Sequence, residues 1–99
     1  VGGRGSDNES LNTTEVLDLE TLAFSRGPTM RTARFGCAAV PLSFGDSQHC
    51  LVIGGLDGAT TLKTTEVLDL ETMESTEGPT MLSEHAGFAA VVVDGECVY

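Results

Sequence analysis

The 99-residue sequence contains no tryptophan and one tyrosine, and its 5 Lys and Arg residues face 15 Asp and Glu residues. Binding to a nucleic-acid backbone requires clustered cations that displace phosphate counterions, and five scattered cations cannot form such a patch. An anionic membrane surface is disfavoured for the same reason. No apolar run approaches the roughly 20 residues of a membrane-spanning helix. We therefore expect neither a nucleic-acid partner nor a membrane partner.

Cysteine is also scarce. The three cysteines, Cys37, Cys50 and Cys97, are odd in number, and none belongs to a CxxC pair. A disulfide scaffold of this size would contain more cysteine. Their apolar surroundings predict three buried free thiols in a reducing compartment, in preference to a redox or metal site.

The sequence does contain an internal repeat. The segment TTEVLDLET at 13–21 recurs unchanged at 64–72, an offset of 51 residues. The segment GPTM at 27–30 recurs at 78–81 with the same offset. Chance does not produce two matches of this length at one offset, so the chain consists of repeated structural units.

Each repeat is predicted to form four short strands, because apolar residues occur in short runs separated by Gly, Pro and Asp. No segment has a helical period of useful length. Asp94-Gly95 predicts a type I′ hairpin between the first two strands, and the other repeat has a longer link at 44–49. We expect first strands at 35–40 and 87–93, second strands at 50–53 and 97–99, a third strand at 15–19, and fourth strands at 22–25 and 73–76.

A period near 50 residues with four strands per repeat is typical of β-propellers, and this length is closer to kelch than to WD40. The sequence resembles kelch repeats at Gly54-Gly55, at Glu66, Val67 and Asp69, and at Pro28, Met30 and Arg34. It departs from the usual kelch pattern at Leu17 and Leu68 (usually aromatic), at Phe24 and Ser75 (usually Trp), and at His85, which replaces Arg34. The resemblance implies an all-β fold of four-stranded antiparallel blades.

The repeat boundaries divide this single kelch region of residues 1–99 into about two blades' worth of structure. Residues 1–30 form the end of one blade, 31–81 a full blade and 82–99 the start of another. Propellers close with about 4 to 8 blades. We therefore expect an incomplete propeller with further kelch blades in cis. A ring of several copies, closed through chain ends that are in phase with the repeat, is the less favoured alternative.

The links after the second and fourth strands should emerge on one face, because antiparallel strands alternate in direction. The kelch resemblance implies that this face recognises a protein partner. Loop residues are commonly just solvated, and we expect Arg34 and Glu66 to pair within the fold. The candidate binding residues are Arg4, Asp7, Asn8, Arg31, Arg34, Asp57, Lys63 and His85.

No residue pattern predicts catalysis, a cofactor or a metal ion. His49 and His85 have no partners at metal-ligand spacing, and no nucleophile elbow or phosphate-binding loop occurs. We expect a non-catalytic protein-interaction module of the adaptor or scaffold type. The alternative is part of a kelch-like propeller enzyme (galactose-oxidase-like or sialic-acid-processing) whose catalytic residues lie on other blades.

Overall fold

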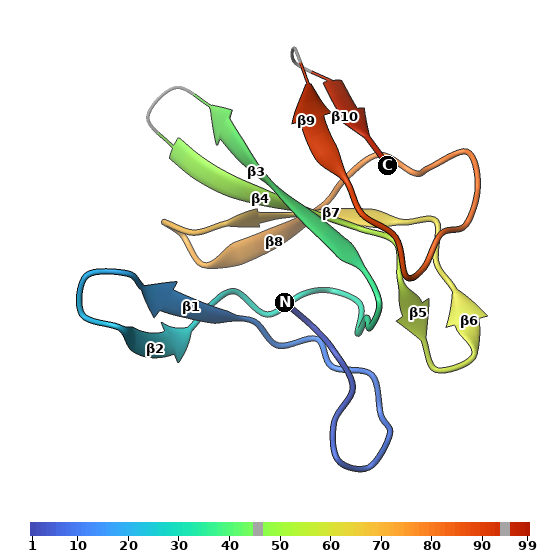
Figure 1. The fold of residues 1–99 in the computed structure, drawn as a ribbon, viewed down its shortest axis with the longest axis horizontal. Helices are drawn as coiled ribbons and strands as arrows, with labels where there is room; N and C mark the ends of the chain where they lie inside the picture. The colour runs from blue at the N-terminus through green and yellow to red at the C-terminus, as the bar shows by residue number, and fades with distance from the viewer. Residues whose placement is uncertain (45–46, 94–95) are drawn as a thin grey trace.

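A computed structural model of the chain describes residues 1–44, 47–93 and 96–99, and within them the protein is all-β (Figure 1). None of these residues belongs to a helix that could cross a membrane. The strands are β1 (Glu15–Asp18), β2 (Ala23–Arg26), β3 (Ala38–Phe44), β4 (Ser47–Ile53), β5 (Leu56–Asp57), β6 (Thr60–Thr61), β7 (Thr65–Asp69), β8 (Glu74–Glu77), β9 (Val91–Val93) and β10 (Glu96–Val98).

The centre of the molecule is a four-stranded antiparallel sheet in the order β3-β4-β7-β8. On one side of it lies the two-stranded sheet β1-β2, and on the other side the two-stranded sheet β9-β10 (Figure 1). These outer sheets are the third and fourth strands of one repeat and the first and second strands of another. The predicted all-β class with kelch-type, four-stranded antiparallel sheets is confirmed, and the outer sheets are those of an incomplete propeller.

The first hairpin of the central sheet is longer than the sequence suggested. The first strand starts at Ala38, not at Phe35, and continues to Phe44. The predicted link at 44–49 is wrong because Gln48 and His49 belong to β4 and pair with β3. Pro41 is tolerated within β3 because that strand lies at the edge of the sheet. Residues 45–46 and the predicted Asp94-Gly95 turn lie outside the described residues.

The sequence repeat is reproduced in the hydrogen bonds. The N–H of Gly27 donates to the Thr14 carbonyl at 3.0 Å, and the Thr14 hydroxyl donates to the Pro28 carbonyl at 2.7 Å. The same two bonds recur 51 residues along the chain. The Thr65 carbonyl accepts from the Gly78 N–H at 3.0 Å, and the Thr65 hydroxyl donates to the Pro79 carbonyl at 2.6 Å. The Thr-Thr-Glu and Gly-Pro motifs therefore recur because they hold the third strand against the segment that follows the fourth.

Two apolar clusters cover opposite faces of the central sheet, since the neighbouring residues Val52 and Ile53 point to opposite faces. In the first cluster, Met30 and Leu68 pack with Val52, and Cys37 and Cys50 lie against them. In the second, Val40 and Met81 pack with Ile53, and Leu51, Phe88, Ala90 and Cys97 lie against them. Each repeat thus places one methionine between neighbouring sheets. All three cysteines are free thiols, as predicted, but each is half-buried, so the prediction that they are buried is wrong.

The glycine pair Gly54-Gly55 turns the chain from β4 into the β5–β6 hairpin. Both residues have positive φ, 60° and 97°. A Cβ atom on Gly54 would lie 2.5 Å from the His85 carbonyl oxygen, and one on Gly55 would lie 2.8 Å from that of Phe35. Only glycine combines this backbone conformation with such close approach.

Candidate functional site

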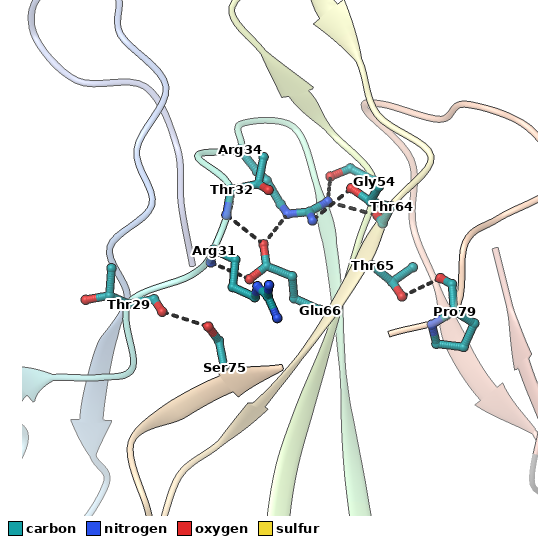
Figure 2. Close-up of polar contacts among 10 residues, drawn as sticks. All are labelled: Thr29, Arg31, Thr32, Arg34, Gly54, Thr64, Thr65, Glu66, Ser75 and Pro79. Carbon is teal, nitrogen blue, oxygen red and sulfur yellow. Dashed lines mark hydrogen bonds and ion pairs between the residues drawn. The ribbon is translucent and has the colours of Figure 1, made fainter. Parts of the chain in front are cut away.

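The buried carboxylate of Glu66 on β7 lies in a network of hydrogen bonds (Figure 2). It accepts hydrogen bonds from the backbone N–H groups of Arg31 at 2.5 Å and Thr32 at 3.1 Å. It also pairs with Arg34, whose Nε lies 3.0 Å from Oε2. We call this arrangement the Glu66 clamp. It fixes the link that enters the blade against the blade's third strand.

Arg34 uses four of its five N–H donors within the fold, one of them in the ion pair with Glu66. Its Nη1 donates to the carbonyl oxygens of Gly54 at 3.0 Å and Thr64 at 2.9 Å, and its Nη2 donates to the Thr64 hydroxyl at 3.0 Å (Figure 2). The whole residue is buried, as is Glu66. The expected pairing within the fold is confirmed, and Arg34 is thereby removed from the candidate binding residues.

Three other candidates lie together on the loop of residues 4–12. Arg4 forms an isolated bridge with Ser10 across the base of this loop. At its tip, the N–H of Asn8 donates to the Gly5 carbonyl at 3.0 Å, and Asn8 has a φ of 60°. Arg4, Asp7 and Asn8 are exposed. The loop is closed by its own hydrogen bonds and presents these side chains to solvent.

The loop of one repeat is joined to the equivalent loop of the next. The Ser10 hydroxyl accepts a hydrogen bond from the Gly58 N–H at 2.9 Å, and Gly58 lies in the turn between β5 and β6. Asp57, another candidate, is exposed on β5 beside this contact. We call the surface formed by residues 4–12 and 56–61 the loop face. It lies away from the β1–β2 and β7–β8 turns (Figure 1).

An arginine is held at the foot of the loop face by an aromatic ring. The guanidinium carbon of Arg4 lies 4.1 Å from the centroid of the Phe35 ring. Phe35 is itself tied to the β5–β6 hairpin, because it exchanges backbone hydrogen bonds with Leu56 at 2.9 Å and 2.8 Å. This cation–π contact restricts the orientation of the Arg4 side chain while leaving the residue exposed.

The remaining candidates lie elsewhere along the links. Arg31 is exposed beside the Glu66 clamp, and Lys63 is exposed where its carbonyl accepts from the Met81 N–H at 2.7 Å. His85 is half-buried, with its ring centroid 5.0 Å from that of Tyr99 and 5.6 Å from that of Phe88. The structure therefore brings Arg4, Asp7, Asn8 and Asp57 together but places Arg31, Lys63 and His85 apart from them.

Sequence reasoning missed Ser10, which belongs to the loop face, and Phe35, which contacts Arg4 and Leu56 of that face. Neither has an identical counterpart 51 residues along, since Thr61 and Ala86 stand there. A repeat comparison selects residues that are retained, so it overlooks residues that join neighbouring repeats at one place only. These two residues could have been found by looking for positions in the links where the two repeats differ.

The described residues contain no group of three or more His, Cys, Asp or Glu side chains arranged to hold a metal ion. Burial raises the pKa of the Cys37 and Cys50 thiols. A raised pKa leaves less thiolate at neutral pH, so these two thiols are weak nucleophiles.

An apolar cavity of about 170 Å³ lies between the central sheet and β10. Sites for drug-sized ligands usually measure about 300–1,000 Å³ and contain a few converging polar groups. This cavity is lined by Leu51, Ile53, Thr65, Pro79, Thr80, Met81, Cys97 and Tyr99. Its residues come from neighbouring repeats, and we interpret it as a packing gap between blades.

Comparison with known proteins agrees with this architecture. Residues 1–31 match the family model of the kelch motif. A comparison with curated proteins found no match. The matched residues include the first copy of the Thr-Thr-Glu and Gly-Pro motifs, whose second copy makes the same hydrogen bonds in the central sheet. Residues 1–31 therefore contain a kelch motif, and the following residues repeat its pattern at an offset of 51.

Proposed function

We propose that the chain is a non-catalytic protein-interaction module of the adaptor or scaffold type, and that the loop face binds the protein partner. Kelch repeats generally mediate protein interactions. The observation that carries the proposal is the Ser10–Gly58 hydrogen bond, which joins loops of two repeats into one exposed surface. A surface that is already ordered loses less conformational entropy on binding.

The charge of the chain indicates the kind of partner. The formal net charge is −10, and the loop face itself carries Asp7, Glu9 and Asp57 with Arg4 as its cation. A partner with a basic surface would be attracted over long range, and its association would slow as salt is added. Arg4 on Phe35 would supply a central, oriented contact, since arginine and aromatic residues are enriched at interface centres.

A non-catalytic role is favoured by how the titratable side chains are used. Arg34 is buried and makes four hydrogen bonds to internal partners, and the His85 ring packs against two other rings. The loop face offers carboxylates and a guanidinium, and its Ser10 hydroxyl is engaged by the Gly58 N–H. Such a set is suited to recognition through charge and hydrogen bonding.

The proposal is tested by affinity capture with three forms of the chain. The wild type is compared with a triple variant, Arg4→Ala with Asp7→Ala and Asp57→Ala, and with the control Glu71→Ala. Glu71 is exposed in the turn before β8, away from the loop face. A partner that is retained by the wild type and the control but lost by the triple variant supports the proposal. Equal retention by all three forms contradicts it.

A further inference from the structure

Arg4 and Ser10 face each other across the base of the loop at residues 4–12. They form an antiparallel bridge, and residues directly opposite each other in such a bridge direct their side chains to the same face. Their Cβ atoms then lie about 4.5–5.5 Å apart. Among the described residues, the Arg4 guanidinium contacts the Phe35 ring and forms no ion pair. The guanidinium is therefore within reach of a group attached to Ser10.

The Ser10 hydroxyl has a backbone donor on its other side. It accepts the hydrogen bond from the Gly58 N–H at 2.9 Å, and it donates to no other group of the described chain. The space beside this N–H is open, because nothing lies within 4 Å of a Cβ atom placed on Gly58. A group larger than a hydroxyl can therefore occupy this position without meeting the neighbouring hairpin.

The nearest carboxylate along the chain points away from this position. Successive side chains of an extended segment alternate between faces, so Glu9 lies on the face opposite to Ser10. A Cβ atom on Gly5 would lie 3.7 Å from Glu9 Oε1, which places that carboxylate over Gly5. The other acidic residues of the loop face are Asp7 at the loop tip and Asp57 on β5. Ser10 thus shares its face with the cation of the loop.

The pairing of an arginine with a hydroxyl occurs in the first repeat alone. In the equivalent hairpin, β5–β6, the residues opposite each other are Leu56 and Thr61. A hydroxyl is retained there, but an apolar side chain replaces the arginine. The hairpin therefore forms without a cation at this position, and Arg4 is not required by the fold of the loop.

We propose that Ser10 is a phosphorylation site whose phosphate is held between the Arg4 guanidinium and the Gly58 N–H. A serine kinase would transfer the γ-phosphoryl group of ATP. The bond from Ser10 Oγ to phosphorus forms as the bond from that phosphorus to the leaving ADP oxygen breaks, and the hydroxyl proton passes to the base of the kinase. A phosphate carries a charge of about −1.5 to −2, and its oxygens accept charge-assisted hydrogen bonds from arginine and backbone N–H groups.

The phosphate would regulate the loop face, a consequence that rests on the proposed function. Arg4 would turn from the Phe35 ring to the phosphate, because an ion pair with a dianion is stronger than an exposed cation–π contact. The loop face would then lose its one cation as a contact for the partner. Affinity for the captured protein should fall about tenfold, which is the usual effect of removing a central arginine contact.

The first test measures the pKa of the phosphate in the complete 99-residue chain. Peptides 1–36 and 37–99 are joined by chemical ligation at Gly36-Cys37, which allows phosphoserine to be placed at Ser10 or, as the control, at Ser6. Ser6 is exposed at the loop tip and has no arginine opposite it. The phosphate at Ser10 should have a second pKa at least about 0.5 below that at Ser6, in titrations followed by phosphorus NMR. Arg4→Ala should remove most of the difference.

The second test asks whether Ser10 receives phosphate. The chain is produced in cultured eukaryotic cells with phosphatases inhibited, and its phosphorylated residues are located by mass spectrometry. Phosphate should be found on Ser10 and should be lost in Ser10→Ala. The matched variant Ser6→Ala should retain it.

Three results overturn the proposal. They are equal phosphate pKa values at Ser10 and Ser6, a difference that Arg4→Ala leaves unchanged, and a chain from cells that carries no phosphate on Ser10. None of these measurements involves the partner, so they stand even if the loop face binds no protein. A partner that is captured equally by the unmodified chain and by the chain phosphorylated at Ser10 would contradict the regulatory step alone.

Discussion

Arg34 Nε lies 3.0 Å from Glu66 Oε2, in an ion pair from which solvent is almost fully excluded. The two residues are 32 positions apart in the sequence. The pair joins the link that enters the central blade to the third strand of the same blade. The Glu66 carboxylate also accepts hydrogen bonds from backbone N–H groups, and the Arg34 guanidinium also donates to backbone carbonyl oxygens. Neither charge is therefore left without compensation.

Arg34→Ala should destabilise the fold by about 3–5 kcal/mol, because it leaves a buried carboxylate without its countercharge. Urea unfolding followed by circular dichroism measures this change. The control is Glu77→Gln, which alters an exposed carboxylate opposite Glu66 on β8 and should stay within about 0.5 kcal/mol of wild type. Equal effects of the two substitutions would show that the clamp contributes no stability.

Gly54→Ala should destabilise the chain more than Gly58→Ala. The two glycines have nearly the same φ, 60° and 62°. A Cβ atom at Gly54 would meet the His85 carbonyl oxygen, whereas nothing lies within 4 Å of one at Gly58. The dihedral strain is therefore shared, and overpacking adds about 1–3 kcal/mol at Gly54 alone. Thermal unfolding of both variants checks the difference, and a Gly58→Ala variant as unstable as Gly54→Ala would refute it.

Acidification should remove stability that Asp69 provides. The backbone N–H groups of Glu71 and Thr72 hydrogen-bond to this carboxylate and lower its pKa below the ordinary 3.8, with His49 nearby as a lesser cause. A lowered pKa means that the contribution is complete above the unfolded value and is lost as pH falls through the folded one. Asn at this position keeps an acceptor but does not titrate.

The stability of the Asp69→Asn variant should accordingly fall less steeply than that of the wild type as the pH is lowered from about 5 to about 3. Urea midpoints of the wild type and the variant, measured across this range, make the comparison. Parallel profiles would mean that the turn at Glu71 and Thr72 gains nothing from the charge of Asp69.

The repeat allowed much of the fold to be predicted, because motifs such as Thr-Thr-Glu and Gly-Pro mark hydrogen bonds that every blade needs. The extension of β3 and β4 beyond Val40 could not be predicted. It contains Pro41 and polar residues, and it is stabilised by cross-strand pairing that only the hairpin creates. The β5–β6 hairpin is likewise too short to have a sequence pattern.

The candidate site was predicted less well than the fold. Arg34 was correctly expected to pair with Glu66, because both belong to the repeat pattern. The position of Arg4 over Phe35 depends on two side chains from different links, and neither link has a pattern that identifies its neighbour. Contacts between repeats follow from how the sheets pack, which a single repeat does not encode.

The Glu66 clamp also sets an order of events during synthesis. The chain leaves the ribosome from its N-terminus, so Arg34 emerges well before the third strand that holds its partner. Until that strand is made, the guanidinium of Arg34 stays hydrated, and the link at 31–34 is held only by backbone hydrogen bonds such as those of Arg34 with Gly3 and Leu11. The first repeat can therefore complete its contacts with the central blade only after that blade is translated at least as far as Glu66. Neighbouring blades should consequently become stable in overlapping pairs.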